Sequence, residues 1–272
     1  MTVVETGPAW LFVPADRPER FDKAVLSGAD QIILDLEDAV PPSAKDEARN
    51  CAVRWLLDGG HGWVRVNGPT TAWFRPDLEA LAGATGLEGV VVPKSDNLND
   101  PREVRSISRA PRVAALIETA RGVRQTFDLA DSGDVDVLML GTIDLALDLG
   151  CDETDDSFAL ARSTLVLASR SACLPPPVDG VTVSFRDPVV VREVAARARA
   201  LGFGGKLAIH PAQIGPLRAG FQPSEEQVAW ALKILAANVE GVGGLEGEMI
   251  DKPVLARAET ILRRRDAVVG TS

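Results

Sequence analysis

The sequence predicts an α/β protein in which eight parallel strands close into a (β/α)8 barrel, the TIM-barrel architecture, followed by a C-terminal helical extension. Short apolar runs of β character recur eight times along the chain. Segments with helical spacing lie between these runs, and strands that alternate with helices pair in parallel through right-handed crossovers. The length of 272 residues is typical of a single barrel.

Each predicted strand is rich in Val, Ile, Leu or Trp and ends where polar or small residues take over. In chain order the strands span residues 10–14, 31–37, 63–67, 89–94, 113–118, 135–140, 178–183 and 206–210. A doubly wound open sheet is the competing architecture. It usually has fewer strands and a Gly-rich first turn, which this sequence lacks.

The predicted helices have apolar residues at helical spacing, and several begin at Pro, Ser or acidic residues and end at glycine. In chain order they span residues 17–29, 42–60, 73–83, 98–109, 120–131, 156–173, 187–202, 210–221 and 224–238. No shift in composition precedes residue 240, so we expect one catalytic barrel domain over residues 1–240.

Residues 241–272 differ from the barrel and form the predicted C-terminal extension. They open with a Gly-rich stretch, after which a helix is expected to begin near Pro253, with Asp251 just ahead of it. An extension of this kind either packs on its own barrel or reaches a neighbouring subunit. The spacing of its residues does not decide between the two.

Composition limits the possible partners. The net charge of −10 argues against nucleic acid, because phosphate binding needs a basic face. No apolar stretch approaches the roughly 20 residues that a membrane span requires. The N-terminal stretch carries no secretion signal, and the three cysteines are widely spaced without a CxxC motif. We therefore expect a cytoplasmic protein with reduced thiols.

The ends of the predicted strands carry an unusual set of polar residues, and in a barrel all strand ends meet around one mouth. In chain order the set is Asp35, Glu37, Asp38, Arg65, Asn67, Lys94, Glu118, Asp144, Asp179 and His210. Some members also have a simple structural explanation. Lys94 could neutralise a neighbouring acid, whereas Asp179 is typical of a turn and His210 of a helix start.

Glu118 and Asp144 are the most informative pair in this set. Each follows a buried apolar run, so both side chains are expected at the carboxyl edge of the sheet. A helix-capping acid is the alternative explanation for either one. Two carboxylates from neighbouring strands, with water in the remaining positions, are typical of a magnesium site.

Arg65 is hard to explain as a purely structural residue. A polar group within a β-run costs several kcal/mol to bury unpaired, so Arg65 must meet the acids, a carboxylate ligand, or both. Its planar guanidinium suits bidentate carboxylate binding. Magnesium beside Arg65 would hold an α-keto or α-hydroxy carboxylate, and this combination favours carbon–carbon bond cleavage or formation.

Several stretches resemble the citrate lyase β-subunit-like proteins, which belong to the HpcH/HpaI aldolase and malyl-CoA lyase group. They are VPADRPERFDKA, LDLEDAV, VRVN, VVPK, ALIETARGV, PPVDGVTVSFRD, KLAIHPAQI and EGEMIDKPVLARAE, in the expected order over residues 9–265. The resemblance implies a magnesium-dependent carbon–carbon lyase that cleaves or forms a 3-hydroxyacyl-CoA thioester. Malyl-, citramalyl- or 3-hydroxy-3-methylglutaryl-CoA would yield an acyl-CoA and a keto acid.

The resemblance also implies roles for residues at the barrel mouth. Glu118 and Asp144 would be the magnesium ligands, with Glu118 also contacting the substrate. Arg65 would bind the substrate carboxylate. Glu37 and Asp38 would hold metal-bound water and so take part in catalysis.

Further roles implied by the resemblance concern the periphery of the site. Asp251 would enter the active site of the adjacent subunit and handle the proton, which implies a homotrimer or a hexamer. Lys94 would bind substrate, and Lys206 and His210 would lie near the CoA end.

Two features depart from the family pattern. Ile143 stands beside Asp144 where the family often has Glu, and residues 148–160 are acidic without a recognisable substrate motif. Three alternatives therefore stay open. The chain could be a citrate lyase β subunit that acts on a citryl-carrier thioester, a keto-acid aldolase that never uses CoA, or a metal- and metabolite-binding protein without chemistry.

Overall fold

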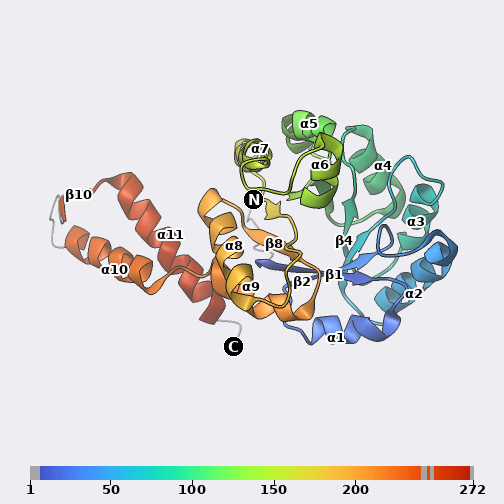
Figure 1. Ribbon diagram of the computed structural model, residues 1–272, viewed down its shortest axis with the longest axis horizontal. Coiled ribbons are helices and arrows are strands. Elements are labelled where there is room, and N and C mark those ends of the chain that lie inside the picture. The colour runs from blue at the N-terminus through green and yellow to red at the C-terminus, as the bar shows by residue number, and fades with distance from the viewer. Residues whose placement is uncertain (1–6, 240–243, 246–247, 270–272) are drawn as a thin grey trace.

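The computed structural model describes residues 7–239, 244–245 and 248–269. Its main part is a closed barrel of eight parallel strands in sequence order, so the predicted (β/α)8 architecture is confirmed. Figure 1 shows the strands enclosed by helices. The strands are β1 (Ala9–Pro14), β2 (Gln31–Asp35), β3 (Gly62–Arg65), β4 (Leu87–Val92), β5 (Val113–Ile117), β6 (Val137–Leu140), β7 (Val178–Asp179) and β8 (Gly205–Ala208).

Helices follow the strands around the barrel. They are α1 (Phe21–Val25), α2 (Lys45–Leu57), α3 (Phe74–Leu81), α4 (Asn99–Ser108), α5 (Ala120–Asp131), α6 (Thr142–Leu149), α7 (Ala159–Ser171), α8 (Pro188–Leu201) and α9 (Ile214–Phe221), with short 3-10 turns at Pro18–Arg20, Pro42–Ala44 and Pro211–Gln213. The sequence pattern does not predict α6. Only Gly141 separates this helix from β6, so its apolar residues follow closely on the run that predicted the strand.

Side chains from both faces of each strand are buried, which explains why the strands read as continuous apolar runs. Trp10, Ile33 and Trp63 pack inside the barrel, where the ring centroids of the two tryptophans lie 5.1 Å apart. The next residues along two of these strands, Leu11 and Leu34, belong to the apolar layer between barrel and helices. The barrel is therefore filled by side chains up to its mouth.

Strand β7 is shorter than the predicted 178–183, because side chains replace its backbone ladder. Lys206 Nζ donates to the carbonyl oxygen of Gly180 at 2.6 Å. Gln213 Nε2 donates to the carbonyl oxygens of Thr182 and Ser184 at 2.7 and 3.2 Å. The chain after Asp179 is thus held by polar side chains of the following segment rather than by strand pairing.

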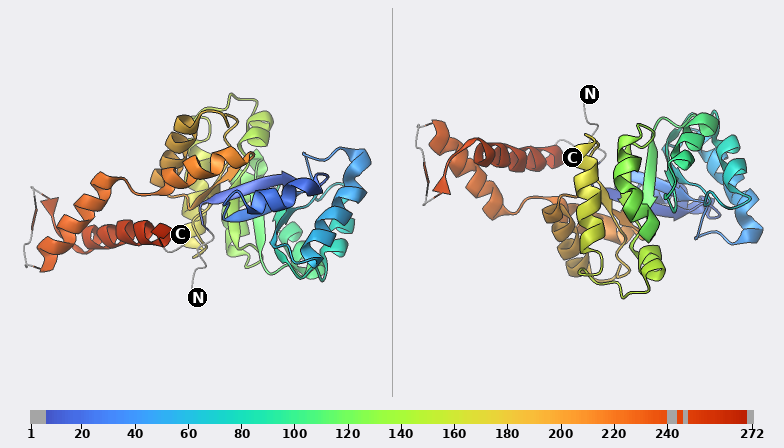
Figure 2. Two further views of the ribbon diagram at one scale, coloured as in Figure 1. Left: turned by 90° about the horizontal axis from the view of Figure 1, so that it is seen from below. Right: turned by 90° about the horizontal axis from the view of Figure 1, so that it is seen from above.

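A helical arm follows the barrel. It consists of α10 (Glu225–Val239), the short strands β9 (Gly244–Leu245) and β10 (Glu248–Met249), which pair antiparallel, and α11 (Lys252–Val269). Figures 1 and 2 show this arm extending away from the barrel beyond α8 and α9. Its two helices share a small core of their own, made by Ala231, Ile234, Ala258 and Ile261.

The arm meets the expectation of a helix near Pro253. The rest of the Gly-rich stretch, residues 240–243 and 246–247, lies outside the described residues. Helix α10 packs on α11, although the sequence-based boundary at residue 240 assigns it to the barrel, and this domain division stays a prediction. None of the described helices combines the length and apolar character that a membrane crossing needs.

Replacing Asp179 by Asn tests the charged wall at β7. Asp179 accepts from Lys206 Nζ at 2.9 Å and from Arg162 Nε at 3.1 Å, and both partners are largely buried. Burial alone would raise the pKa of Asp179, but the charges of Lys206 and Arg162 outweigh it and hold the pKa below its ordinary value of 3.8. Asp179→Asn leaves Lys206 buried without its counterion, so we expect a loss of about 3–5 kcal/mol at pH 7.

The lowered pKa of Asp179 also predicts how the loss of stability depends on pH. A lowered pKa contributes stability above 3.8 that is lost as the pH falls through the folded value, so the difference between variant and unchanged protein should shrink in acid. Urea denaturation at several pH values measures it. Asp128→Asn, which alters an exposed acid of α5, is the control. A difference that is independent of pH would contradict the assignment.

Candidate active site

Five carboxylates gather at the mouth of the barrel, and we call Asp35, Glu37, Asp38, Glu118 and Asp144 the acid cluster. Three of them stand at the end of β2 or just after it. Glu118 directly follows β5, and Asp144 lies in the first turn of α6. Because the carboxyl ends of parallel strands meet at one edge, residues far apart in sequence become neighbours here, as the sequence predicts.

Arg65 is the last residue of β3 and is 9 % exposed. Its Nε and Nη2 donate to the two carboxylate oxygens of Asp35 at 2.8 and 2.7 Å, and its Nη1 lies 3.0 Å from Glu37 Oε2. The guanidinium carbon lies 4.6 Å from the ring centroid of Phe12. Burial alone would lower the pKa of Arg65, but Asp35 and Glu37 hold it above its ordinary value.

This geometry refines the sequence-based expectation for Arg65. Asp35 already binds the guanidinium through two parallel hydrogen bonds, so a carboxylate ligand would find only the remaining N–H groups. The sequence places Asp35 at the strand end without indicating its role. The directly opposed register of Asp35 and Arg65 on neighbouring strands is the signal that could have identified the pair.

Lys94 lies among the carboxylates. Its Nζ is 2.9 Å from Glu37 Oε1, 3.8 Å from Asp144 Oδ1 and 3.9 Å from Glu118 Oε1. Its backbone N–H donates to Glu118 Oε1 at 2.7 Å. Burial alone would lower the pKa of Lys94, but Glu37 and the other acids raise it above its ordinary value. Lys94 therefore neutralises acids, one of the explanations that its sequence position allows.

Glu118 is 2 % exposed and is the most deeply placed of the two expected metal ligands. Burial, and then the negative charge of Glu37, raise the pKa of Glu118 to about 8, although Arg65 and Lys94 oppose the rise. Burial, the largest cause, disfavours the ionised form of Glu118. A cation bound to this carboxylate would offset that cost.

Glu118 and Asp144 fit a magnesium ion. Both are hard oxygen donors, they share Lys94 as a neighbour, and the side chain of Asp144 is 30 % exposed. Among the described residues, no group of three or more His, Cys, Asp or Glu side chains could hold a metal. Magnesium is usually bound through one or two carboxylates with water and substrate completing the shell, whereas zinc needs more protein ligands.

Lys45 holds the backbone of the loop that carries Glu37 and Asp38. The Nζ of Lys45 donates to the backbone carbonyl oxygens of Leu36 and Glu37, both at 2.7 Å. Burial raises the pKa of Glu37, although the positive charges of Arg65 and Lys94 oppose the rise. The side chain of Asp38 is exposed, and Arg65 Nη1 is 3.9 Å from Asp38 Oδ2. Asp38 therefore lies at the outer edge of the cluster.

The structure does not bring Lys206 and His210 to the acid cluster. Lys206 is buried, and its Nζ binds Asp179 and Gly180 in the barrel wall. His210 is exposed, its Nδ1 accepts from the backbone of Ala212 at 3.1 Å, and its ring stacks on Phe185 with centroids 4.7 Å apart. Their expected roles at a CoA end stay predictions.

Asp251 also lies apart from the cluster of its own chain. It is exposed and caps α11, where its Oδ1 accepts from the backbone N–H of Val254 at 3.0 Å. Helix α11 begins at the end of the arm that is farther from the barrel (Figure 1). An Asp251 that acts in catalysis would have to do so in another copy of the chain.

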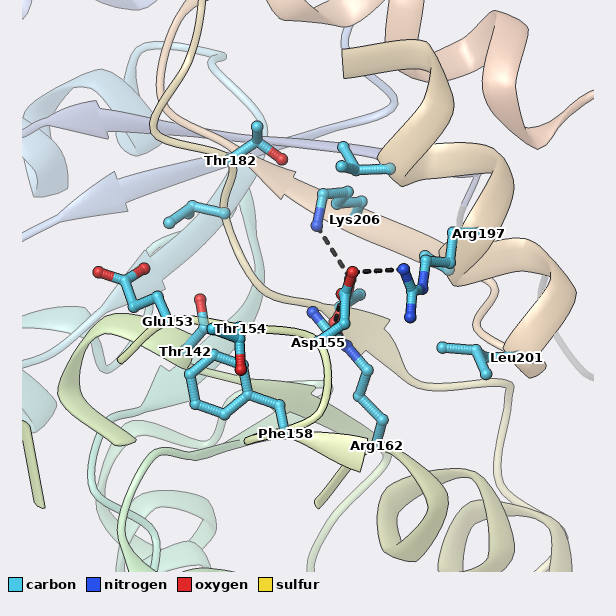
Figure 3. Close-up of a pocket in the computed structure, with 14 residues that line it drawn as sticks. Thr142, Glu153, Thr154, Asp155, Phe158, Arg162, Thr182, Arg197, Leu201 and Lys206 are labelled. Atoms are coloured by element: carbon cyan, nitrogen blue, oxygen red, sulfur yellow. Dashed lines mark hydrogen bonds and ion pairs between the residues drawn. The ribbon is translucent and has the colours of Figure 1, made fainter. Parts of the chain in front are cut away.

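A cavity of about 390 Å³ lies beside β7, between the loop that follows α6 and helices α7 and α8. Figure 3 shows its charged lining, in which Asp155 pairs with Arg162 and Arg197. Lys206 and Glu153 also line it, and no member of the acid cluster does. The acidic segment 148–160 thus supplies one wall of this cavity, where Asp155 ties α7 to α8.

Comparisons with known proteins identify the family of the chain. Residues 9–211 match the model of the HpcH/HpaI aldolase/citrate lyase family. The chain belongs to that family. The predicted resemblance and the predicted enzyme class, a carbon–carbon lyase, are therefore confirmed.

Individual relatives cover nearly the whole chain. A citrate lyase subunit beta-like protein of Mycobacterium tuberculosis is 41 % identical over 274 residues, which are 97 % of each chain. A (3S)-malyl-CoA thioesterase of Cereibacter sphaeroides is 33 % identical over 272 residues, 96 % of this chain and 95 % of the relative. The crystal structure of CitE from M. tuberculosis with magnesium, acetoacetate and coenzyme A is similar with a TM-score of 0.86. It is 39 % identical, covering 96 % of this chain and 98 % of that one.

Gly141 gives a first test of the site. A Cβ at this position would lie 2.5 Å from Glu118 Oε2 and 2.6 Å from its Cβ, closer than such atoms approach, so Gly141→Ala must displace the Glu118 side chain. We expect the variant to fold and to lose at least about tenfold in magnesium affinity, as for residues that orient metal ligands. Calorimetric titration with MgCl2 measures the loss.

A matched control is Gly215→Ala in α9, where an added Cβ meets no atom within 4 Å. This variant should bind magnesium as the unchanged protein does. Equal affinities in all three proteins would remove Glu118 from the metal site.

Proposed function

We propose that this chain is a magnesium-dependent lyase that cleaves or forms a 3-hydroxyacyl-CoA thioester, such as malyl-, citramalyl- or 3-hydroxy-3-methylglutaryl-CoA. The products of cleavage would be an acyl-CoA and a keto acid. The observation that carries this proposal is the buried Glu118, whose carboxylate shares a cationic neighbour with Asp144 beside the buried Arg65. The M. tuberculosis neighbour that holds magnesium, acetoacetate and coenzyme A supports it.

In this proposal Glu118 and Asp144 hold the metal. Bound magnesium supplies a Lewis acid for the oxygen on the carbon at which the bond breaks or forms. Glu37 and Asp38 hold metal-bound water. Glu37 is well placed for this task because its carboxylate is already fixed between Arg65 and Lys94.

Arg65 binds the carboxylate of the keto acid through the N–H groups that Asp35 leaves free. The bidentate bond to Asp35 and the contact with Phe12 hold the guanidinium in one orientation before substrate arrives. Such preorganisation lowers the entropy that is lost on binding. Lys94 adds a second positive charge on the substrate side, and its side chain is 42 % exposed.

The thioester end of the substrate would extend from the metal toward the rim. His210 is exposed at the end of β8 and could contact the CoA part. Lys206 is buried and bound to Asp179, so it would act there only by supporting the wall.

Asp251 of an adjacent subunit is the proposed proton-transfer residue, which requires a homotrimer or a hexamer. The exposed position of Asp251 and the projection of the arm away from its own barrel support this arrangement. The three cysteines are free thiols, which supports a cytoplasmic location.

Two related functions remain as alternatives. A citrate lyase β subunit would act on a citryl thioester carried by a partner protein, and a keto-acid aldolase would need no CoA. Incubation of the purified protein with each of the three thioesters and magnesium separates them. Release of acyl-CoA and keto acid supports the proposal, whereas free CoA with an intact hydroxy acid would indicate a thioesterase. Turnover only with a carrier-bound citryl group, or only with pyruvate and an aldehyde, would favour the alternatives.

Glu118→Ala should abolish magnesium-dependent turnover while leaving the fold intact, because it removes one of two protein ligands. Thioester cleavage followed with and without MgCl2 is the measurement, and circular dichroism checks the fold. Glu193→Ala removes an exposed carboxylate on α8 and should leave the rate unchanged. Full activity with unchanged metal dependence in Glu118→Ala would sink the metal assignment. Because Ile143 replaces the expected Glu, full magnesium binding without turnover of any substrate would favour a binding protein.

Asp251→Asn should slow the reaction by at least about a hundredfold without weakening magnesium, because the amide cannot accept or donate the proton as a carboxyl group does. Single-turnover rates and magnesium titration on the same preparation separate the two effects. Mixing Asp251→Asn with Glu118→Ala protein should restore part of the activity if the two residues act across subunits. No recovery in the mixture, despite subunit exchange, would exclude a shared site.

A further inference from the structure

Lys94 occupies the region in which a metal bound to Glu118 and Asp144 would add positive charge. Its ammonium nitrogen is within 4 Å of a carboxylate oxygen of Glu37, Glu118 and Asp144, which follow three different strands at the mouth. Two cations a few ångströms apart at a partly buried site repel each other strongly. The ammonium group and a divalent cation therefore compete for the same carboxylates.

The backbone of Lys94 contacts Glu118 independently of the side chain. Its φ of 49° lies in the left-handed region, which a residue with a Cβ adopts at some energetic cost. This conformation accompanies the 2.7 Å hydrogen bond from the backbone N–H to Glu118 Oε1. Glu118 would thus keep its orientation if the ammonium group moved away.

Among the cationic side chains described around the acid cluster, Lys94 has the most freedom to move. Its side chain is 42 % exposed, against 11 % for Arg65. Arg65 is also held by two hydrogen bonds to Asp35, and Lys45 is buried and bound to two backbone carbonyls. A change in the charge of the cluster is therefore most easily met by movement of Lys94.

We propose that the ammonium group of Lys94 is an exchangeable counterion, which pairs with Glu37, Glu118 and Asp144 and would move toward solvent when a divalent cation binds the last two. The inference rests on the proposed function, because it concerns the same metal site. It makes Lys94 a positioning residue that sets metal affinity: the side chain keeps the carboxylates together and weakens the binding of the divalent cation.

The test compares Lys94→Gln with Lys94→Arg and with Lys23→Gln, which removes an exposed positive charge on α1. Each protein is titrated with MgCl2 in a calorimeter at fixed pH and ionic strength. Removing a competing charge should lower the dissociation constant of magnesium by about tenfold or more in Lys94→Gln. Lys94→Arg retains the charge and should stay close to the unchanged protein, as should Lys23→Gln.

A second readout does not depend on metal binding. In EDTA, Lys94→Gln should unfold at a lower temperature than Lys23→Gln, because the acid cluster has lost a counterion. Added MgCl2 should raise the unfolding temperature of Lys94→Gln more than that of the unchanged protein.

The outcomes separate this inference from the proposed function. A dissociation constant in Lys94→Gln that equals or exceeds that of the unchanged protein overturns the inference, because Lys94 would then support the metal rather than compete with it. If the unchanged protein binds no magnesium, the proposed function loses its metal. The EDTA measurement then decides the counterion role alone, and equal unfolding temperatures for Lys94→Gln and Lys23→Gln overturn it.

Discussion

The buried ion pair between Asp35 and Arg65 fixes the geometry of the mouth. The two residues end neighbouring strands and are paired in the register of the sheet, so strand pairing alone brings their side chains together. Asp35 also accepts from the backbone N–H groups of Glu37 and Ala39 at 2.9 and 3.3 Å. One carboxylate therefore orients the arginine and shapes the turn that carries the next two acids. Because both charges are buried, removing either side chain would leave the other as an unpaired buried charge, which is strongly destabilising.

Above that pair, the carboxylates of the acid cluster outnumber the cationic side chains beside them. Burial and neighbouring acids raise the pKa of Glu118 to about 8, while the cations nearby are already paired with other carboxylates. The side chain of Glu118 is shielded from solvent, whereas that of Asp144 is 30 % exposed. An acidic site with a deep and a shallow member is suited to a divalent ion that brings its own water and then exchanges it for substrate.

Much of this arrangement could be predicted from the sequence. The eight apolar runs predicted the barrel, and the polar residues at their ends then had to share one rim. The partners within the rim could not be predicted in this way. The pairing of Asp35 with two N–H groups of Arg65 depends on strand register, and the position of Lys94 depends on a left-handed backbone conformation at a lysine. The sequence predicts Lys206 near the CoA end, yet the alternation of side chains along β8 turns it outward to Asp179. The neighbouring strand β7 has only two residues, which are too few to show such an alternation in the sequence.

That short seventh strand has a consequence for how the barrel opens. Strand β7 has the shortest backbone ladders, with one residue pair to β6 and two to β8. Beside these ladders, Asp179 forms ion pairs with Lys206 of β8 and Arg162 of α7, and we call this part of the barrel the ionic seam. Guanidinium chloride, which screens charge, attacks this seam as well as the apolar core, whereas urea leaves its Coulomb attraction in place. The two denaturants should therefore trace different early steps in the unfolding of the same barrel.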